Sequence, residues 1–161
     1  MLAIRLATAD DADAVADVYN QGIRERNATF ETALRTRDDI AVWLAAGERL
    51  PLLVAEEDGR VLGWARILAY SHRAAYAGVG EVSVYVDGAA RGRGIGRRLL
   101  EAAQERAREL GYWKLVGKLF TDNVASAALM RSCGWRDVGL HRRHGSLDGH
   151  WRDVLVVERL L

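Results

Sequence analysis

The hydrophobic positions in the first half of the chain follow two different spacings. Apolar residues recur at helical intervals between Ala14 and Ile23, after a polar capping segment at residues 7–11. This pattern predicts an amphipathic helix that ends at about Asn27. Shorter apolar runs elsewhere have the length and the turn-forming flanks of strands. The other segments predicted in this half are a loop at 27–36, a helix at 37–46 and strands at 2–6, 52–56, 61–68 and 81–86.

The second half of the chain repeats a strand–helix–strand order. An apolar stripe predicts a long helix from about Ile95 to Leu110, and Gly111 follows it, where a left-handed cap is commonly needed. Two Asp-Gly pairs, at 58–59 and 148–149, indicate tight hairpins. The other elements predicted here are a strand at 114–120, a helix at 123–131 capped by Asp122 or Asn123, and two strands within 135–161.

This order of elements predicts a single α/β (α+β) domain over residues 1–161 with a mixed sheet. The charges nearly balance, with 23 Lys+Arg against 22 Asp+Glu, which argues against a general nucleic-acid binder. A single cysteine, Cys133, excludes an intramolecular disulfide and is interpreted as a packing residue. No apolar run has the length of a signal peptide or a membrane span, so we expect a cytoplasmic protein without a membrane partner.

The segment Arg91-Gly92-Arg93-Gly94-Ile95-Gly96 joins the strand at 81–86 to the long helix. The first N–H groups of a helix have no intrahelical partner, and the helix dipole adds partial positive charge there. Glycines let an anion approach the backbone, and the arginines add charge, so the loop predicts a phosphate or diphosphate site. A Walker loop would need a lysine after Gly96, and a dinucleotide fingerprint would lie early in a βαβ unit; neither requirement is met.

The pattern Arg-x-x-Gly-x-Gly after a strand resembles the signature of the GNAT superfamily of acetyltransferases. Segments such as Glu81-Val-Ser-Val-Tyr-Val86 and Asp122-Asn-Val-Ala-Ser126 are similar to the phosphinothricin acetyltransferase group. The C-terminal Gly139–Gly145 and Trp151-Arg-Asp153 resemble its arsinothricin-resistance branch. The resemblance implies a mixed, mostly antiparallel sheet of about seven strands flanked by about four helices. It also implies acetyl-CoA as co-substrate, a small-molecule amine as acceptor and a homodimer.

The resemblance also implies roles for individual residues. Glu81 matches the acidic residue that deprotonates the amine, directly or through water. Phe30 and Arg73 match positions on the substrate side, and Tyr76 lies near them in the sequence. The residues assigned to the cofactor are Val84, Tyr85, Val86, Arg91, Gly92, Arg93, Gly94, Ile95, Gly96, Arg97, Asn123 and Ser126.

The chain departs from the family pattern at two places. Ser71-His72-Arg73 has one arginine where relatives often have Arg-x-Arg, and Leu129-Met130 occupies the place of a tyrosine general acid. The general acid is therefore unassigned. Arg73 either pairs with a substrate carboxylate or phosphinate or is a solvated loop residue. His141 or His144 is a candidate for lining the substrate pocket, and no metal site is predicted, because these histidines lack companion ligands.

The residues and the resemblance together predict direct acetyl transfer to the α-amine of a small amino acid analogue. Phosphinothricin, arsinothricin and methionine sulfone or sulfoximine are the expected acceptors. A cationic amine must lose a proton before it can attack a thioester, and Glu81 supplies a base. Three alternatives stay open: acetylation of another small amine, acetylation of a protein N-terminus, and a non-catalytic CoA-binding sensor. Trp64, Trp135 and Trp151 are interpreted as packing residues.

Overall fold

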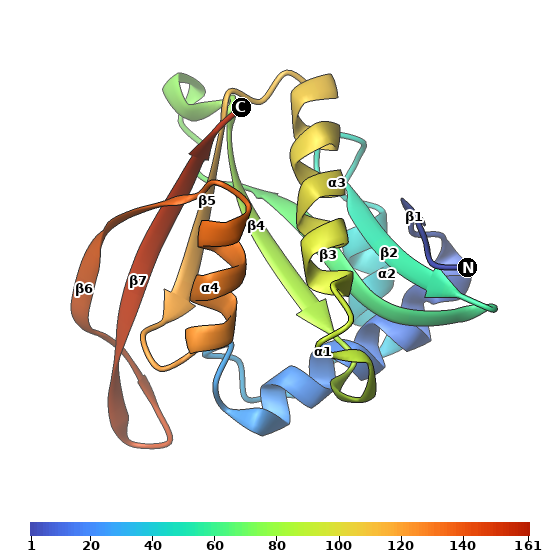
Figure 1. Ribbon diagram of the computed structural model, residues 1–161, viewed down its shortest axis with the longest axis horizontal. Coiled ribbons are helices and arrows are strands. Elements are labelled where there is room, and N and C mark those ends of the chain that lie inside the picture. Colours follow the sequence, from blue (N-terminus) through green and yellow to red (C-terminus); the bar gives the residue numbers. More distant parts are fainter.

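The computed structural model describes residues 1–161 and consists of one seven-stranded sheet covered by helices (Figure 1). The strand order is β1-β2-β3-β4-β5-β7-β6, and only β4 and β5 are parallel neighbours. The predicted mixed, mostly antiparallel sheet is confirmed. The strands are β1 (Ala3–Leu6), β2 (Leu52–Glu57), β3 (Arg60–Ala69), β4 (Val79–Val86), β5 (Lys114–Phe120), β6 (Arg136–Leu147) and β7 (His150–Leu160).

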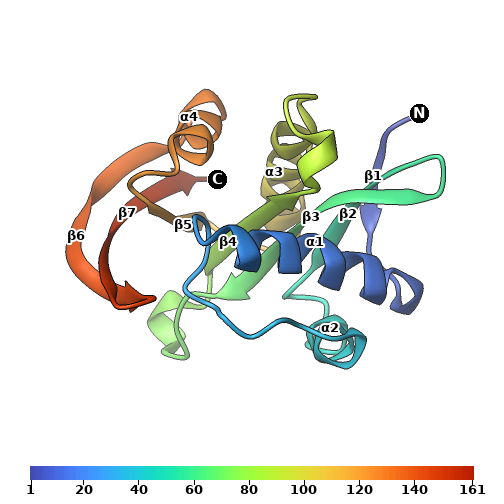
Figure 2. The ribbon, with the colours of Figure 1, turned by 90° about the horizontal axis from the view of Figure 1, so that it is seen from below.

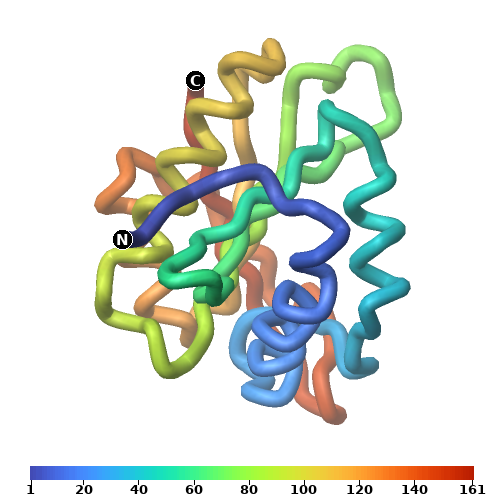
Figure 3. The backbone as a smooth tube through the Cα atoms, turned by 90° about the vertical axis from the view of Figure 1, so that its right-hand side faces the viewer, coloured from blue at the N-terminus to red at the C-terminus, as the bar shows by residue number.

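Two helices lie on each face of the sheet. Figure 2 shows α1 and α2 on one side and α3 and α4 on the other, and Figure 3 shows the same separation of α1 and α2 from α3. All four are predicted from the sequence, with ends that differ by a few residues. The helices are α1 (Ala12–Glu25), α2 (Arg37–Leu44), α3 (Ile95–Glu109) and α4 (Val124–Ser132).

The predicted turns and caps have the backbone conformations that their residue types favour. Asp58 and Gly59 both have positive φ, at 52° and 78°, and Asp148 and Gly149 repeat this at 50° and 78°. Positive φ at both central residues is the requirement of a two-residue hairpin turn of type I′, which Asp-Gly meets well. Gly111 follows α3 at φ 83°, so the predicted left-handed end of that helix is confirmed.

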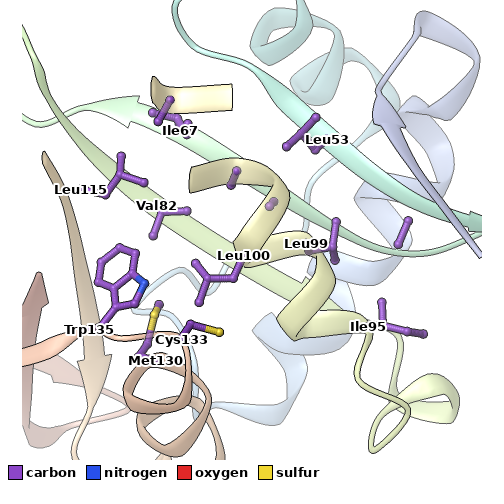
Figure 4. Packing of buried hydrophobic residues seen from close by; sticks show 14 of the residues in the cluster. Leu53, Ile67, Val82, Ile95, Leu99, Leu100, Leu115, Met130, Cys133 and Trp135 are labelled. Atoms are coloured by element: carbon purple, nitrogen blue, oxygen red, sulfur yellow. The ribbon is translucent and has the colours of Figure 1, made fainter. Parts of the chain in front are cut away.

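Each face of the sheet has its own hydrophobic core. The cluster under α3 and α4 includes Leu99, Leu115, Cys133 and Trp135 (Figure 4). The cluster under α1 and α2 includes Trp64. The packing interpretation is therefore confirmed for Cys133, Trp64 and Trp135. The packing interpretation is wrong for Trp151, whose side chain is 64% exposed. Trp151 lies on β7 opposite Ser146 of β6, and this edge strand is almost entirely exposed.

The strands β4 and β5 pair over only three residues. The last paired positions are Glu81 and Val116, and beyond them β4 pairs only with β3 while β5 pairs only with β7. Side chains alternate along β4: Val82, Val84 and Val86 pack toward α3, whereas Tyr85 packs toward α1. Glu81 and Ser83 share the face of Tyr85 by the same alternation. The sheet is thus open between its two central strands, next to Glu81.

An ion pair at the start of the chain makes stability depend on pH. Arg5 donates hydrogen bonds of 2.7 and 2.9 Å to Asp11, and Thr8 N–H donates one of 2.7 Å. The hydrogen bond from Arg5 is the main cause that lowers the pKa of Asp11 to about 2. The folded-state pKa lies below the unfolded value of about 3.9, so this stabilisation is present above pH 4 and lost as the pH falls toward 2.

We therefore expect Asp11→Asn to lower the free energy of unfolding by about 1–2 kcal/mol at pH 7. This range is smaller than the pKa shift alone would give, because Arg5 is partly exposed and solvent screens the pair. The variant should also lose less stability than the wild type between pH 5 and pH 2. Urea titrations at several pH values measure both effects. Asp10→Asn, at an exposed position on the same turn, is the control. Parallel pH curves for the wild type and Asp11→Asn would contradict this assignment.

Candidate active site

The glycine-rich loop presents an uncapped helix end. Gly94 is the N-cap of α3 with φ 77°, and no side chain caps the first turn. Gly92 has φ 76°, and a Cβ at either glycine would meet open space. Both conformations favour glycine, and they leave the first N–H groups of α3 accessible. The arrangement therefore fits a bound anion at the positive end of the helix.

The arginines of this segment are held by carboxylates. Arg91 donates to a glutamate at the end of α1 at 3.0 Å, and Arg93 donates to one at the end of β2 at 2.7 Å. Arg97 pairs with a glutamate one turn along α3 at 2.9 Å. These partners neutralise part of the arginine charge. The backbone N–H groups and the helix dipole therefore contribute more of the attraction for an anion than the sequence indicated. The partners are Glu25, Glu57 and Glu101.

A cavity of about 360 Å³ lies in front of this loop, between the ends of α1 and β4 and the start of α4. Asn123 lines it and caps α4, accepting a hydrogen bond from Ser126 N–H at 3.2 Å, and its Nδ2 donates to the carbonyl of Asn27 at 3.2 Å. Of the residues predicted to bind the cofactor, only Arg93 does not line the cavity. Those that do are Val84, Tyr85, Val86, Arg91, Gly92, Gly94, Ile95, Gly96, Arg97, Asn123 and Ser126.

A second cavity, of about 410 Å³, adjoins the first on the side of α1 and α2. The two share the lining residues Ala28, Val84, Tyr85, Asn123, Ser126 and Leu129, so they form one continuous cleft. Aromatic side chains form much of the wall of this second cavity, which makes it a confined and largely apolar site for a small molecule. They are Tyr19, Phe30, Trp43, Trp64, Tyr85 and Phe120.

Glu81 lines the second cavity at the point where β4 and β5 separate. Its Oε2 lies 2.9 Å from Nζ of Lys118, which is two residues beyond Val116 on β5. The ion pair therefore spans the opening between the strands. Lys118 was not identified from the sequence. The available signal was a second lysine within the strand, four residues after Lys114 and on the same face as Val116.

Arg66 is a second cation of this cavity that sequence reasoning missed. It lies on β3, directly opposite Ser83 of β4, and its Cζ is 4.2 Å from the ring centroid of Trp43. Its Nε is buried without a hydrogen-bond partner, and no carboxylate pairs with it. Burial lowers the pKa of Arg66 to about 10, so the guanidinium is still charged at neutral pH. The signal in the sequence was a charge inside an apolar strand.

The predicted substrate residues separate into two groups. Phe30 lines the cavity and packs edge-to-face on Phe120, with ring centroids 4.7 Å apart. Arg73 and Tyr76 are exposed around a short turn and do not line it. Tyr76 contacts Tyr70 instead.

The histidine pair lies at the far side of the same cavity. His144 lines it, and His141 stacks on the ring of His144 with centroids 4.2 Å apart. Leu129 and Met130, at the place where the family resemblance led us to expect a tyrosine, line the cleft, and their side chains have no proton to donate. No group of three His, Cys, Asp or Glu side chains is placed to hold a metal ion. No helix is long and apolar enough to cross a membrane.

Comparison with known proteins is consistent with this geometry. Residues 15–135 match the acetyltransferase (GNAT) family. A phosphinothricin N-acetyltransferase from Alcaligenes faecalis is 36% identical over 98% of this chain and 82% of its own. The structure of a ribosomal-protein-alanine N-acetyltransferase from Brucella melitensis superposes with a TM-score of 0.95 at 35% identity, covering 99% of both chains.

A third relative was solved with its cofactor. It is a GNAT phosphinothricin acetyltransferase from Sinorhizobium meliloti in complex with acetyl-CoA, with a TM-score of 0.93 at 29% identity. The match covers 99% of this chain and 88% of that one. The family match spans most of the chain, and the relatives match it over nearly its whole length. The protein therefore belongs to the GNAT family of acetyltransferases and is an N-acetyltransferase.

Proposed function

We propose that this enzyme transfers the acetyl group of acetyl-CoA to the α-amine of a small amino acid analogue such as phosphinothricin. Glu81 acts as the general base. The observation that carries the proposal is the position of this carboxylate, beside the opening between β4 and β5. It lines the aromatic cavity, which joins the cavity in front of the glycine-rich loop at Val84 and Tyr85.

The cofactor is proposed to occupy the cavity in front of the loop. Its pyrophosphate binds the N–H groups at the start of α3, beside Gly92 and Gly94. The backbone of Val84–Val86 has no strand partner on the β5 side, so its polar groups are available to the amides of the pantetheine arm, apart from the Val86 carbonyl, which accepts a hydrogen bond from Arg91 Nε at 3.3 Å. The acetyl-CoA complex of the Sinorhizobium relative supports this choice of donor.

The acceptor amine arrives as an ammonium and must lose a proton before it attacks. Glu81 already holds an ammonium group, that of Lys118, at 2.9 Å, which supports its use as the binding point and base for the acceptor. The neutral nitrogen attacks the thioester carbonyl, and a backbone N–H of β4 stabilises the oxyanion. The carbon–sulfur bond then breaks. The nitrogen loses its second proton to solvent as the amide forms, and the thiolate takes up a proton from solvent, because Leu129 and Met130 have no proton to give.

Two kinds of acceptor have support. The Alcaligenes relative and the confined aromatic cavity favour a small amino acid analogue. The Brucella relative, named for acetylation of a ribosomal-protein alanine, favours a protein N-terminus as the second candidate. Of the two, the small acceptor matches a cavity of about 410 Å³ better than an extended chain does.

Release of free CoA thiol from acetyl-CoA tests the proposal. The acceptor panel contains phosphinothricin, arsinothricin, methionine sulfone, plain amino acids, a polyamine, a peptide that begins with alanine, and a control without acceptor. We expect turnover with the amino acid analogues and little with the peptide. Turnover confined to the peptide would move the function to protein N-termini. Tight acetyl-CoA binding without any turnover would favour a sensor.

We also propose that the enzyme is a homodimer. Val138 and Leu140 on β6 and Trp151 on β7 are apolar and exposed, and they offer a surface for a second copy. Size-exclusion chromatography coupled to light scattering should give twice the 17.8 kDa of one chain. A monomeric mass at micromolar concentration would remove this part of the proposal.

A further inference from the structure

The aromatic cavity contains a cation, Arg66, for which the chain supplies no anionic partner. Arginines around the neighbouring cofactor cavity are paired with glutamates, but the buried Nε of Arg66 has no acceptor and no carboxylate neutralises its charge. A desolvated charge without a partner destabilises a folded protein. Groups of this kind concentrate at functional sites, where stability is given up for binding.

The position of Arg66 relative to Glu81 suits one small ligand. Arg66 is opposite Ser83, and Glu81 is two residues before Ser83 on the same face of β4. Such diagonal neighbours have Cα atoms about 7–8 Å apart. Both side chains line the same cavity, so a single molecule can place an amine at Glu81 and an anionic group at Arg66.

The surroundings of Arg66 favour a directed contact. Its guanidinium lies over the ring of Trp43, which restricts its orientation. A planar guanidinium binds carboxylates and phosphinates through two parallel hydrogen bonds. The apolar wall of the cavity lowers the local dielectric and strengthens such a pair.

We propose that Arg66 binds an anionic group of the acceptor, the α-carboxylate or a side-chain phosphinate, and thereby selects amino acid-like acceptors over simple amines. This inference rests on the proposed function of the cavity. It assigns the anchor to a residue inside the cleft, whereas the exposed Arg73 lies outside it.

Steady-state kinetics of Arg66→Met and Arg66→Lys test the assignment. Methionine keeps an unbranched apolar side chain of similar length and removes the charge, and lysine keeps the charge without the planar guanidinium. The acceptors are phosphinothricin, its α-carboxamide, and methionine sulfone, which keeps the carboxylate but has a neutral tail. For acceptors that carry the recognised anion, Arg66→Met should raise KM by about 10- to 100-fold and leave kcat little changed. This range corresponds to the loss of one or two charge-assisted hydrogen bonds. Arg66→Lys should be intermediate.

The acceptor series identifies which anion is bound. If it is the α-carboxylate, phosphinothricin and methionine sulfone both lose affinity in Arg66→Met, and the carboxamide is unaffected. If it is the phosphinate, phosphinothricin and its carboxamide lose affinity and methionine sulfone does not. An equal loss for all three acceptors, or no loss for any, would overturn the proposal. Arg108→Met, on the exposed end of α3, is the matched control and should behave as the wild type.

A second readout does not depend on turnover. Because the charge of Arg66 has no anionic partner, its removal in Arg66→Met should raise the Tm of the protein without ligand and leave acetyl-CoA affinity unchanged. Phosphinothricin should stabilise the wild type against heat, and Arg66→Met should lose that stabilisation. An identical ligand-induced shift in both proteins, or none in the wild type, would count against Arg66 as an anion anchor. Failure of the proposed function would be recognised separately, as absence of thiol release by the wild type.

Discussion

Replacement of Glu81 by glutamine is expected to lower kcat for amine acetylation by about 10²- to 10⁴-fold, the usual contribution of a positioned base. Glutamine keeps the size of the side chain but cannot accept a proton from the ammonium. Only acceptor molecules that are already neutral would then react. The residual rate of Glu81→Gln should therefore rise about tenfold per pH unit until the pH reaches the pKa of the acceptor amine.

Thiol-release kinetics across a pH series measure this effect, and acetyl-CoA affinity measured by calorimetry should be unchanged. Glu105→Gln, on the exposed end of α3, makes the same chemical change far from the cleft and should retain wild-type rates. A variant of Glu81 with the wild-type rate and pH profile would exclude this residue as the base. The family assignment would still hold, but the general base would then be unassigned.

Substitution of Gly94 by alanine should weaken acetyl-CoA binding by about tenfold, which corresponds to the loss of about one charge-assisted hydrogen bond of 1.5 kcal/mol. The residue has φ 77°, and an added Cβ would meet no protein atom. Alanine there either projects into the space before the helix end or turns the following peptide away from it. Both changes disturb the N–H groups that the pyrophosphate would contact.

Gly111→Ala is the matched control, because Gly111 ends the same helix at φ 83° and a Cβ there also meets open space. Both variants should lose about 1–2 kcal/mol of stability, since each holds alanine in a left-handed conformation. Only Gly94→Ala should lose acetyl-CoA affinity in calorimetric titrations. Equal affinity in the two variants would mean that the loop does not bind the donor.

The fold and the proposed donor side of the cleft were predictable because their signals are local. The helices follow from apolar periodicity and caps, and the hairpins from Asp-Gly pairs whose conformations are confirmed. The glycine-rich loop is contiguous, and the chemistry of a helix N-terminus depends on few neighbours. Its residues can therefore be listed from the sequence, and all but Arg93 line one cavity.

The proposed acceptor side was less predictable because it is assembled by strand register. Arg66, Lys118 and His144 come from three different strands, and only the pairing of those strands brings them into one cavity with Glu81. A charged residue inside an apolar strand is a weak signal by itself. Arg73, in contrast, was favoured by its place in a family pattern, yet it lies on an exposed turn. A pattern records neighbours in the chain, whereas the cavity depends on neighbours in space.

The alternation of side chains along β4 has a consequence for how this enzyme can evolve. Val82, Val84 and Val86 belong to the core under α3, while Glu81 and Ser83 line the aromatic cavity on the opposite face. Glu81 and Ser83 are not part of that core, so a substitution at either position changes the wall of the cavity without removing a core side chain. After gene duplication, one copy could acquire a new acceptor through a few changes on β3 and α2. The glycine-rich loop and the start of α3 would be inherited unchanged, so a lineage could diversify its acceptors within the same fold.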